Sequence, residues 1–319
     1  MLKDMPLEEL RRYQGNVAMP DDFDAFWQRT LAESRAAAEP LDLTPVPTRL
    51  KTVDVYDLTF PGFAGQPVKA WVRAPHGETG PLPAVVSYVG YGGGRGLPME
   101  TLLWASAGYV HVHMDTRGQG SGWSVGETPD FGPTGPAVAG VCTRGIDDRE
   151  TYYYRRLFTD AVLAVDAARQ LPMVDAARIG TTGGSQGGAM ALASAALATG
   201  VKASWISVPF MSDVRRAVEA TDTRPYAEFA EYLACHRDQV ERVYATLAYF
   251  DGVNFARRAS VPAVITAALM DDIVPASTVF AVHHNYAGPN ELVVWSHNGH
   301  EAGGPFEDAQ ALDFFADRL

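Results

Sequence analysis

Cysteine is scarce in this chain of 319 residues, which contains only Cys142 and Cys235. The two lie far apart, and neither belongs to a Cys-x-x-Cys pair or to a cysteine and histidine pattern with zinc-finger spacing. A disulfide framework and a structural zinc site are therefore excluded as the basis of the fold.

Long apolar runs are also missing, since nowhere do about 18 uninterrupted apolar residues occur, the length that a membrane-spanning helix needs. The N-terminal segment MLKDMPLEELRRYQG has no apolar core of the signal-peptide type. Basic residues are outnumbered, because 26 Lys and Arg face 38 Asp and Glu and leave a net charge of −12. Binding to nucleic acid requires clusters of Lys and Arg side chains that contact the phosphates. We therefore expect a cytoplasmic protein that binds neither membrane nor nucleic acid.

Short apolar segments recur along the chain and are the main sign of its fold. Segments that are apolar at nearly every position are typical of strands buried on both faces of a sheet. Two earlier segments alternate with period two around turn residues and predict an antiparallel hairpin at the sheet edge. The predicted strands are 53–60, 68–75, 84–90, 109–115, 178–183, 203–209, 262–271 and 291–297. Segments with helical spacing lie at 97–107, 150–170, 186–199, 275–286 and 305–319.

This alternation of strand and helix predicts an α/β fold with an eight-stranded, mostly parallel sheet flanked by helices. We expect a single domain over residues 1–319, with residues 1–50 as an N-terminal extension. Residues 211–258 interrupt the rhythm and are predicted to form two or three amphipathic helices between strands six and seven. This insertion is expected either to cap a cleft or to add only helical packing.

The segment GGSQG, residues 183–187, fits Gly-x-Ser-x-Gly and lies between a predicted strand and a predicted helix. In that setting a serine stands on a tight turn at a helix N-terminus, where free N–H groups stabilise negative charge. The alternative is a plain glycine-rich connection or a nucleotide-binding loop, but no lysine follows and Gly-x-Gly-x-x-Gly is absent here. Ser185 is thus the candidate nucleophile.

A nucleophilic serine needs a base and a carboxylate that orients the base. The seventh predicted strand ends in Asp271 and Asp272, and His297 and His300 follow the eighth. The order Ser, Asp, His at the ends of parallel strands is that of a strand-end triad. Either aspartate and either histidine suit these roles. Asp271 is favoured as the first residue off its strand, and His300 because Gly299 precedes it.

Acyl transfer also needs N–H donors for the oxyanion. The backbone N–H of Gln186, directly after the serine, is one candidate, and it matters more than the Gln186 side chain. The glycine-rich loop VGYGGGRG, residues 89–96, follows the third predicted strand and offers a second donor. Tyr91 is the candidate there.

These motifs together resemble the acetyl xylan esterase and cephalosporin C deacetylase group, carbohydrate esterase family 7 of the α/β-hydrolase superfamily. The resemblance runs over nearly the whole chain, through GYGGGRG, WASAGY, DTRGQG, TRGIDDRETYYYRRLFTDAVLAV, GGSQGG, LMDDIVPASTVFAVHHN and NGHE. It implies an α/β-hydrolase fold and a serine esterase that removes acetyl groups from xylo-oligosaccharides, simple acetylated sugars and cephalosporin C. It also implies a homo-oligomer, often a hexamer, without metal or organic cofactor.

Carried over by motif position, the resemblance makes Ser185 the nucleophile, Asp271 the orienting acid and His300 the base. Tyr91 and Gln186 become the oxyanion donors. The chain departs from the family at residue 89, where valine replaces the usual histidine, and at residues 274–276, where Val-Pro-Ala replaces Cys-Pro-Pro. Both departures adjoin the expected site and leave substrate preference open.

Other functions remain as alternatives. A carboxylesterase of wider acyl range or a peptidase would keep the triad. His111 and His113 lie on one face of a strand with a spacing that metal hydrolases use, although packed core histidines are the more common reading. The guanidinium of Arg117 in RGQG suits a carboxylate or phosphate, or only a structural loop. A non-catalytic binding protein is the last alternative.

Overall fold

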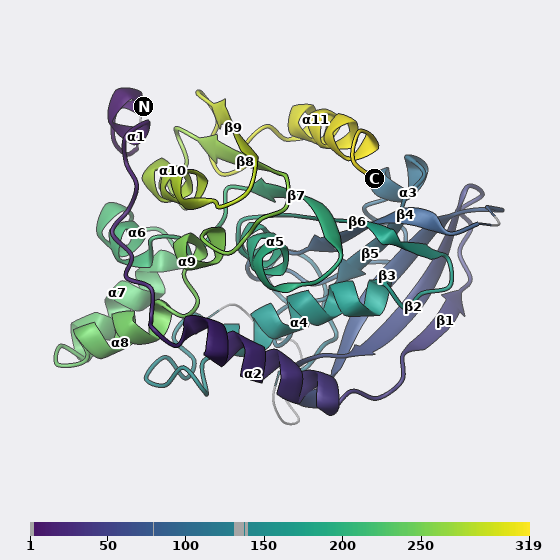
Figure 1. Cartoon of the computed structure of the whole chain (residues 1–319), viewed down its shortest axis with the longest axis horizontal. Coiled ribbons are helices and arrows are strands. Elements are labelled where there is room, and N and C mark those ends of the chain that lie inside the picture. Colours follow the sequence, from purple (N-terminus) through teal and green to yellow (C-terminus); the bar gives the residue numbers. More distant parts are fainter. Residues whose placement is uncertain (1–2, 79, 131–136, 138–139) are drawn as a thin grey trace.

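One large sheet forms the centre of the computed structural model (Figure 1). The structure describes residues 3–78, 80–130, 137 and 140–319. In this part of the chain its strands follow the order β1-β2-β3-β5-β4-β6-β7-β8-β9. The pairs β1–β2, β2–β3 and β3–β5 are antiparallel, and the other five pairs are parallel. The strands are β1 (Asp42–Val46), β2 (Val53–Pro61), β3 (Pro67–Pro75), β4 (Leu82–Tyr88), β5 (Val110–Met114), β6 (Val174–Gly184), β7 (Val201–Ser207), β8 (Ala263–Ala268) and β9 (Asn290–Trp295). The mostly parallel sheet expected from the sequence is confirmed.

The strand count is corrected from eight to nine by β1, which pairs with β2 along Asp42–Val46. None of the β1 residues is fully buried, and Pro45 cannot donate to a ladder, so the segment lacks the apolar alternation that marks a strand. Because β1 forms the edge, the β2–β3 hairpin lies inside the sheet and not at its edge as predicted.

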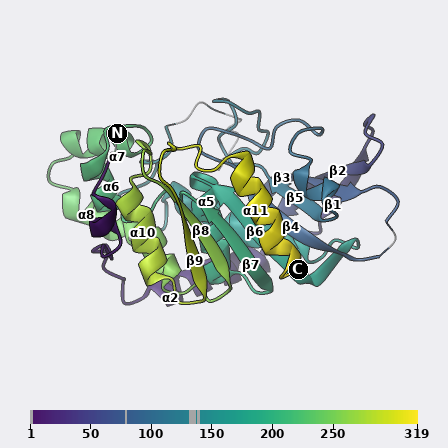
Figure 2. The same ribbon diagram turned by 90° about the horizontal axis from the view of Figure 1, so that it is seen from above.

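Helices cover both faces of the sheet (Figures 1 and 2). Apolar side chains of α4, α5 and α10 share one large core with the sheet, and α2 and α9 pack against that layer. Side chains of α3 and α11 form a second core with the opposite face. The helices are α1 (Leu7–Leu10), α2 (Phe23–Ala36), α3 (Leu103–Ser106), α4 (Tyr153–Ala168), α5 (Gln186–Leu197), α6 (Val214–Ala220), α7 (Tyr226–Cys235), α8 (Val240–Leu247), α9 (Gly252–Ala256), α10 (Ala276–Asn285) and α11 (Pro305–Ala316), with a 3₁₀ turn at Phe63–Gly65.

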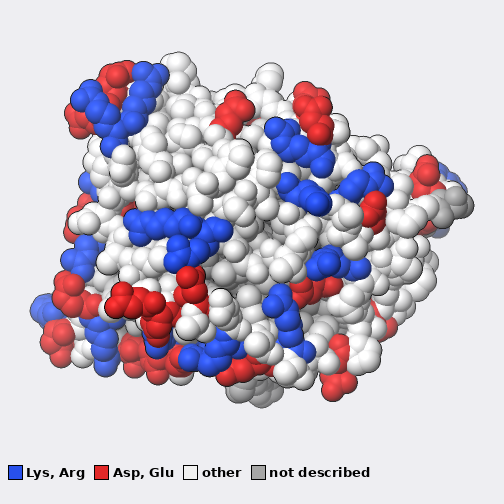
Figure 3. Space-filling model, in the orientation of Figure 1, with Lys and Arg blue, Asp and Glu red and all other residues white. Residues whose placement is uncertain are grey.

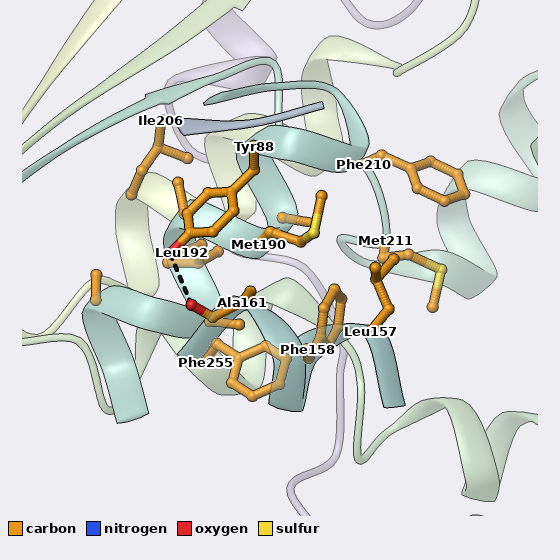
Figure 4. Packing of buried hydrophobic residues seen from close by; sticks show 14 of the residues in the cluster. Tyr88, Leu157, Phe158, Ala161, Met190, Leu192, Ile206, Phe210, Met211 and Phe255 are labelled. Carbon is orange, nitrogen blue, oxygen red and sulfur yellow. Dashed lines mark hydrogen bonds between the residues drawn. The ribbon is translucent and has the colours of Figure 1, made fainter. Parts of the chain in front are cut away.

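The larger core fixes the carboxyl ends of the central strands. Figure 4 shows Tyr88, the last residue of β4, pointing toward α4, where its hydroxyl donates to the carbonyl oxygen of Ala161 at 2.9 Å. Phe158, Met190 and Ile206 surround it from α4, α5 and β7. Each fully buried side chain of this size contributes roughly 1.5–3 kcal/mol. Contacts with the helical layer thus hold in place the strand ends that carry the candidate site.

The insertion at residues 211–258 contains four helices, α6 to α9, where two or three were predicted. With β1 counted, it lies between the seventh and eighth strands. Figure 1 shows α6, α7 and α8 grouped at the left of the molecule, next to α9 and α10. The N-terminal segment binds this insertion, because the Tyr13 hydroxyl donates to Asp213 at 2.7 Å and Asp4 pairs with Arg216 at 2.5 Å.

Charged side chains of both signs lie next to one another along the lower edge of the face in Figure 3, and smaller groups of both signs stand at its upper left and upper right with uncharged surface between them. Among the described residues, no helix is both long and apolar enough to cross a bilayer.

Candidate active site

Ser185 stands between the end of β6 and the start of α5 with a backbone φ of 58°. This left-handed conformation is uncommon for a residue with a side chain and is typical of a strained functional turn. The backbone holds it in place: the N–H of Ser185 donates to the carbonyl oxygen of Ser207 at 3.0 Å, and its own carbonyl oxygen accepts from Phe210 at 3.0 Å.

The glycines around Ser185 make this turn possible. A Cβ atom on Gly183 would lie 2.4 Å from the carbonyl oxygen of Gly187. A Cβ atom on Gly187 would lie 2.4 Å from the carbonyl oxygen of Tyr88, and one on Gly188 2.5 Å from that of Ser207. The nearest atom to a Cβ on Gly184 would be 3.9 Å away, an ordinary contact. Positions 183, 187 and 188 thus exclude a side chain, and position 184 does not.

Asp271, three residues after β8, lies against His300, which follows β9. The Asp271 Oδ2 atom is 2.8 Å from Nδ1 of His300, and Oδ1 accepts the backbone N–H groups of Ile273 at 2.8 Å and Val274 at 2.9 Å. The carboxylate is fully buried, and the His300 side chain is 26% exposed. This contact occupies Nδ1 and leaves Nε2 of the imidazole for another partner.

The other two candidates lie elsewhere. The Asp272 side chain is 56% exposed and forms a long ion pair of 3.8 Å with Lys3. His297 is exposed. The structure therefore brings Asp271 and His300 together and leaves Asp272 and His297 on the surface.

The loop after β4 packs against the serine turn. Its backbone approaches closely, because a Cβ atom on Gly187 would also lie 3.5 Å from the carbonyl carbon of Val89. In the part of the chain that the structure describes, neither the backbone N–H of Tyr91 nor that of Gln186 donates to a protein acceptor. Both N–H groups are available to a ligand at this edge of the sheet.

Two side chains that the sequence did not single out, Glu228 and Trp123, contact Tyr91 of this loop. The Tyr91 hydroxyl donates to Glu228 of α7 at 2.8 Å, and burial raises the pKa of Tyr91. The indole of Trp123, 67% exposed, donates to the carbonyl oxygen of Tyr91 at 2.8 Å. A single Glu or Trp in a helix or loop carries no sequence signal of such a contact.

His111 and His113 both contact Ser87, whose hydroxyl oxygen is 2.6 Å from Nε2 of His111 and 2.6 Å from Nδ1 of His113. Burial lowers the pKa of His111 well below its usual value and that of His113 to about 3. Within the described residues no three His, Cys, Asp or Glu side chains are grouped to hold a metal ion. The two histidines are hydrogen-bonded side chains of the β4–β5 pair.

Arg117 of the RGQG segment binds a carboxylate of its own chain. Its guanidinium donates from Nε and Nη2 to the two oxygens of Asp160 on α4, at 2.5 and 2.8 Å, and from Nη1 to Gln66 at 2.7 Å. All of Arg117 and the Asp160 side chain are buried. This fork-like pair stabilises the loop after β5.

The family model for acetyl xylan esterase (AXE1) matches residues 1–318. The acetyl esterase Axe7A of Xylanibacter ruminicola is 29% identical over 297 residues, which cover 92% of this chain; the chain spans 65% of the length of that curated relative.

Two solved structures are similar over nearly all of both chains. An acetyl xylan esterase from Paenibacillus sp. R4 is 37% identical with a TM-score of 0.90, over 99% of this chain and 100% of that one. Acetyl xylan esterase 1 from Thermoanaerobacterium sp. JW/SL YS485 is 33% identical with a TM-score of 0.89, over 98% and 99%. An acylaminoacyl peptidase of Pyrococcus horikoshii, 18% identical with a TM-score of 0.61 over 85% of this chain and 43% of that one, shares the fold alone. The α/β-hydrolase fold expected from the sequence is confirmed.

Proposed function

The chain belongs to the acetyl xylan esterase family, and from this membership and the site geometry we propose that it is a serine esterase that removes acetyl groups from small acetylated carbohydrates. The observation that carries the proposal is the 2.8 Å contact between buried Asp271 and His300, at the same sheet edge as Ser185 on its left-handed turn. A nucleophile turn and an oriented imidazole are the two parts that acyl transfer to serine requires.

In the proposed mechanism the Ser185 hydroxyl attacks the ester carbonyl while Nε2 of His300 takes its proton. Asp271 holds the ring through Nδ1 and stabilises the imidazolium that forms. The oxyanion accepts hydrogen bonds from the backbone N–H groups of Tyr91 and Gln186. The carbon–oxygen bond then breaks, and the alcohol leaves with the proton from His300.

Deacylation repeats these steps with water. His300 takes a proton from the water as its oxygen attacks the acetyl-serine carbonyl, and the second tetrahedral species releases Ser185, which regains the proton from His300. The products are acetate and the free enzyme. No step uses a metal ion or an organic cofactor.

The proposed substrates are acetylated xylo-oligosaccharides and simple acetylated sugars, with cephalosporin C as a further acetyl ester. Support comes from the names of the similar proteins, which are acetyl xylan esterases and an acetyl esterase. The alternative is a carboxylesterase of wider acyl range on the same fold. Hydrolysis rates for nitrophenyl acetate, butyrate and longer esters separate the two, with a peptide amide as the control for a peptidase. Equal rates across chain lengths would exclude acetyl selectivity.

Labelling with a fluorophosphonate tests nucleophile and base together. We expect peptide mass analysis to find the label on Ser185 in the wild type and very slow labelling in His300→Ala. No label on Ser185 would support a non-catalytic binding protein. Loss of activity with a chelator, together with an active Ser185→Ala variant, would support a metal hydrolase.

We also propose that the protein is cytoplasmic and forms a homo-oligomer, with a hexamer as the state that the family resemblance implies. It would bind a small ester and neither nucleic acid nor membrane. Sedimentation velocity at micromolar concentration measures the oligomer directly, and a monomer would contradict this proposal.

A further inference from the structure

Two buried glutamine side chains connect the loop after β4 to the serine turn. The backbone N–H of Gly92 donates to Oε1 of Gln119 at 2.6 Å, and Nε2 of Gln119 donates to Oε1 of Gln186 at 2.9 Å. Nε2 of Gln186 donates in turn to the carbonyl oxygen of Val89 at 3.4 Å. The chain of bonds starts and ends on the same loop, on either side of Tyr91, and passes through the residue after Ser185. We refer to these three bonds as the glutamine bridge.

The direction of the glutamine bridge is fixed by the backbone at both ends. The N–H of Gly92 can only donate, so an oxygen of Gln119 must face it, and the amide nitrogen of Gln119 then faces Gln186. Val89 presents a carbonyl oxygen that can only accept, so the amide nitrogen of Gln186 must face it. The two side-chain amides satisfy both conditions in one arrangement, which leaves neither free to turn over.

Burial makes this arrangement rigid. The side chains of Gln119 and Gln186 are both fully buried, where a missing partner costs about 1–3 kcal/mol. Two tyrosines of α4 contact the bridge from outside its three bonds: Nε2 of Gln119 also donates to the Tyr153 hydroxyl at 2.8 Å, and the Tyr154 hydroxyl donates to Oε1 of Gln186 at 3.1 Å. All four side chains lack contact with bulk solvent.

We propose that Gln119, together with the side chain of Gln186, is a positioning residue that sets the separation of the two oxyanion donors. This inference rests on the proposed function, in which the N–H groups of Tyr91 and Gln186 bind the oxyanion. One donor lies inside the segment that the bridge encloses, and the other belongs to a bridge residue. Donors fixed before the reaction stabilise developing charge without reorganisation.

The RGQG segment therefore has two roles. Arg117 binds Asp160 and so stabilises the fold, whereas Gln119, two residues later, points toward the site. The Gln186 side chain has a role as well, whereas the sequence pointed only to the Gln186 backbone.

The test uses the intact protein and the variants Gln119→Met and Gln186→Met, in which an unbranched side chain of similar length lacks the amide. We expect kcat for nitrophenyl acetate to fall roughly 10- to 100-fold in each, because a donor displaced by about 1 Å costs up to about 10²-fold. KM should change less than about threefold, since the ground-state ester makes little use of these donors. The inhibition constant of methylboronic acid, whose serine adduct places an oxygen at the donors, should rise by the same factor as kcat/KM falls.

Tyr153→Phe is the matched control. It removes a hydroxyl that accepts from Gln119 and donates to the carbonyl oxygen of Arg117 at 2.6 Å, but it leaves the three bonds of the bridge, so kcat should stay within about threefold of wild type. In the double variant Gln119→Met/Gln186→Met the loss should be close to that of the larger single variant, because the two side chains act as one unit. Gln186→Met alone decides the question if Gln119→Met does not fold.

Hydrogen exchange supplies a readout that does not depend on esterase activity. Amides of residues 89–96 should exchange faster in both Met variants than in Tyr153→Phe. Unchanged exchange and unchanged kcat in the Met variants would overturn the inference, as would a fall in kcat with unchanged methylboronic acid binding. A wild-type protein without ester hydrolysis would instead refute the proposed function, and the exchange rates would still decide whether the bridge holds the loop.

Discussion

The Tyr91 hydroxyl and the Glu228 carboxylate share a hydrogen bond of 2.8 Å, which joins the loop after β4 to helix α7 of the insertion. The same hydroxyl oxygen accepts the backbone N–H groups of Gly140 at 2.8 Å and Val141 at 2.9 Å. The other Glu228 oxygen accepts the N–H of Cys142 at 3.1 Å. The insertion is therefore bonded to the loop that carries a proposed oxyanion donor, and it contributes more than distant helical packing.

Replacement of Tyr91 by phenylalanine tests this connection. Tyr91→Phe keeps the backbone N–H but leaves a buried Glu228 oxygen and two N–H groups without this partner, at a cost of about 1–3 kcal/mol. We expect a lower free energy of unfolding in urea and a fall in kcat of up to about tenfold as the loop loosens. Unchanged stability would show that water replaces the hydroxyl. Trp123→Phe, which removes one bond from an exposed indole, is the control and should change stability by less than about 0.5 kcal/mol.

The glycines of the serine turn make a second, graded prediction. Gly187→Ala and Gly183→Ala each place a methyl group 2.4 Å from a carbonyl oxygen, so the turn must shift. We expect these variants to lose most esterase activity and several degrees of melting temperature. Gly184→Ala should keep activity within a few-fold, because its methyl group meets nothing closer than 3.9 Å. Calorimetry with nitrophenyl acetate kinetics measures both effects, and equal losses in all three variants would contradict the geometric explanation.

Most of the sheet could be predicted because buried strands carry continuous apolar segments, as in 84–90 and 203–209. The prediction missed β1 because an exposed edge strand with a proline resembles a loop. The sequence also predicted a helix over residues 97–107, whereas α3 spans only Leu103–Ser106. Pro98 and the left-handed backbone of Thr101, with φ of 50°, end any helix before that point.

The sequence predicts those parts of the candidate site that follow from the order of the strands. Strand ends bring Ser185, Asp271 and His300 to one edge of the sheet, and the sequence shows where each strand stops. The choice between neighbouring candidates depended on a one-residue offset, since Asp271 is buried and Asp272 exposed. Contacts such as Gln119 to Gln186 join residues 67 positions apart, and no local pattern reports them.

Asp271→Asn tests the orienting carboxylate. One Asp271 oxygen already accepts two backbone N–H groups, so the asparagine nitrogen must face Nδ1 of His300 and favour the tautomer with its proton on Nε2. That tautomer cannot accept the proton of Ser185, and we expect kcat to fall about 10³- to 10⁴-fold with KM little changed. Asp272→Asn should retain nearly full activity, because Asp272 is exposed. Comparable losses in both variants would reject Asp271 as the orienting acid.

Acid stability should depend on the two histidines that contact Ser87. Burial lowers the pKa of His111 and His113, the latter to about 3, below the usual value of 6.5. The unfolded chain therefore binds more protons than the folded one between about pH 6.5 and 3, and stability falls as the pH is lowered through that window. Above pH 6.5 both states are neutral at these positions and the effect disappears. Each unit of pKa difference corresponds to about 1.4 kcal/mol, so the acid loss amounts to a few kcal/mol.

The variants His113→Asn and His111→Gln place an amide near the ring nitrogen that contacts Ser87, without a group that titrates in this range. Their stability at pH 7 should be somewhat lower than that of the wild type, because the new side chains fill the space less well. Their loss of stability between pH 6.5 and 4 should nevertheless be smaller, since the proton uptake on unfolding is gone. His76→Gln is the control, because that side chain is 62% exposed and does not belong to the buried histidine pair. Urea unfolding at several pH values measures the slopes, and parallel slopes for all four proteins would show that other groups dominate acid unfolding.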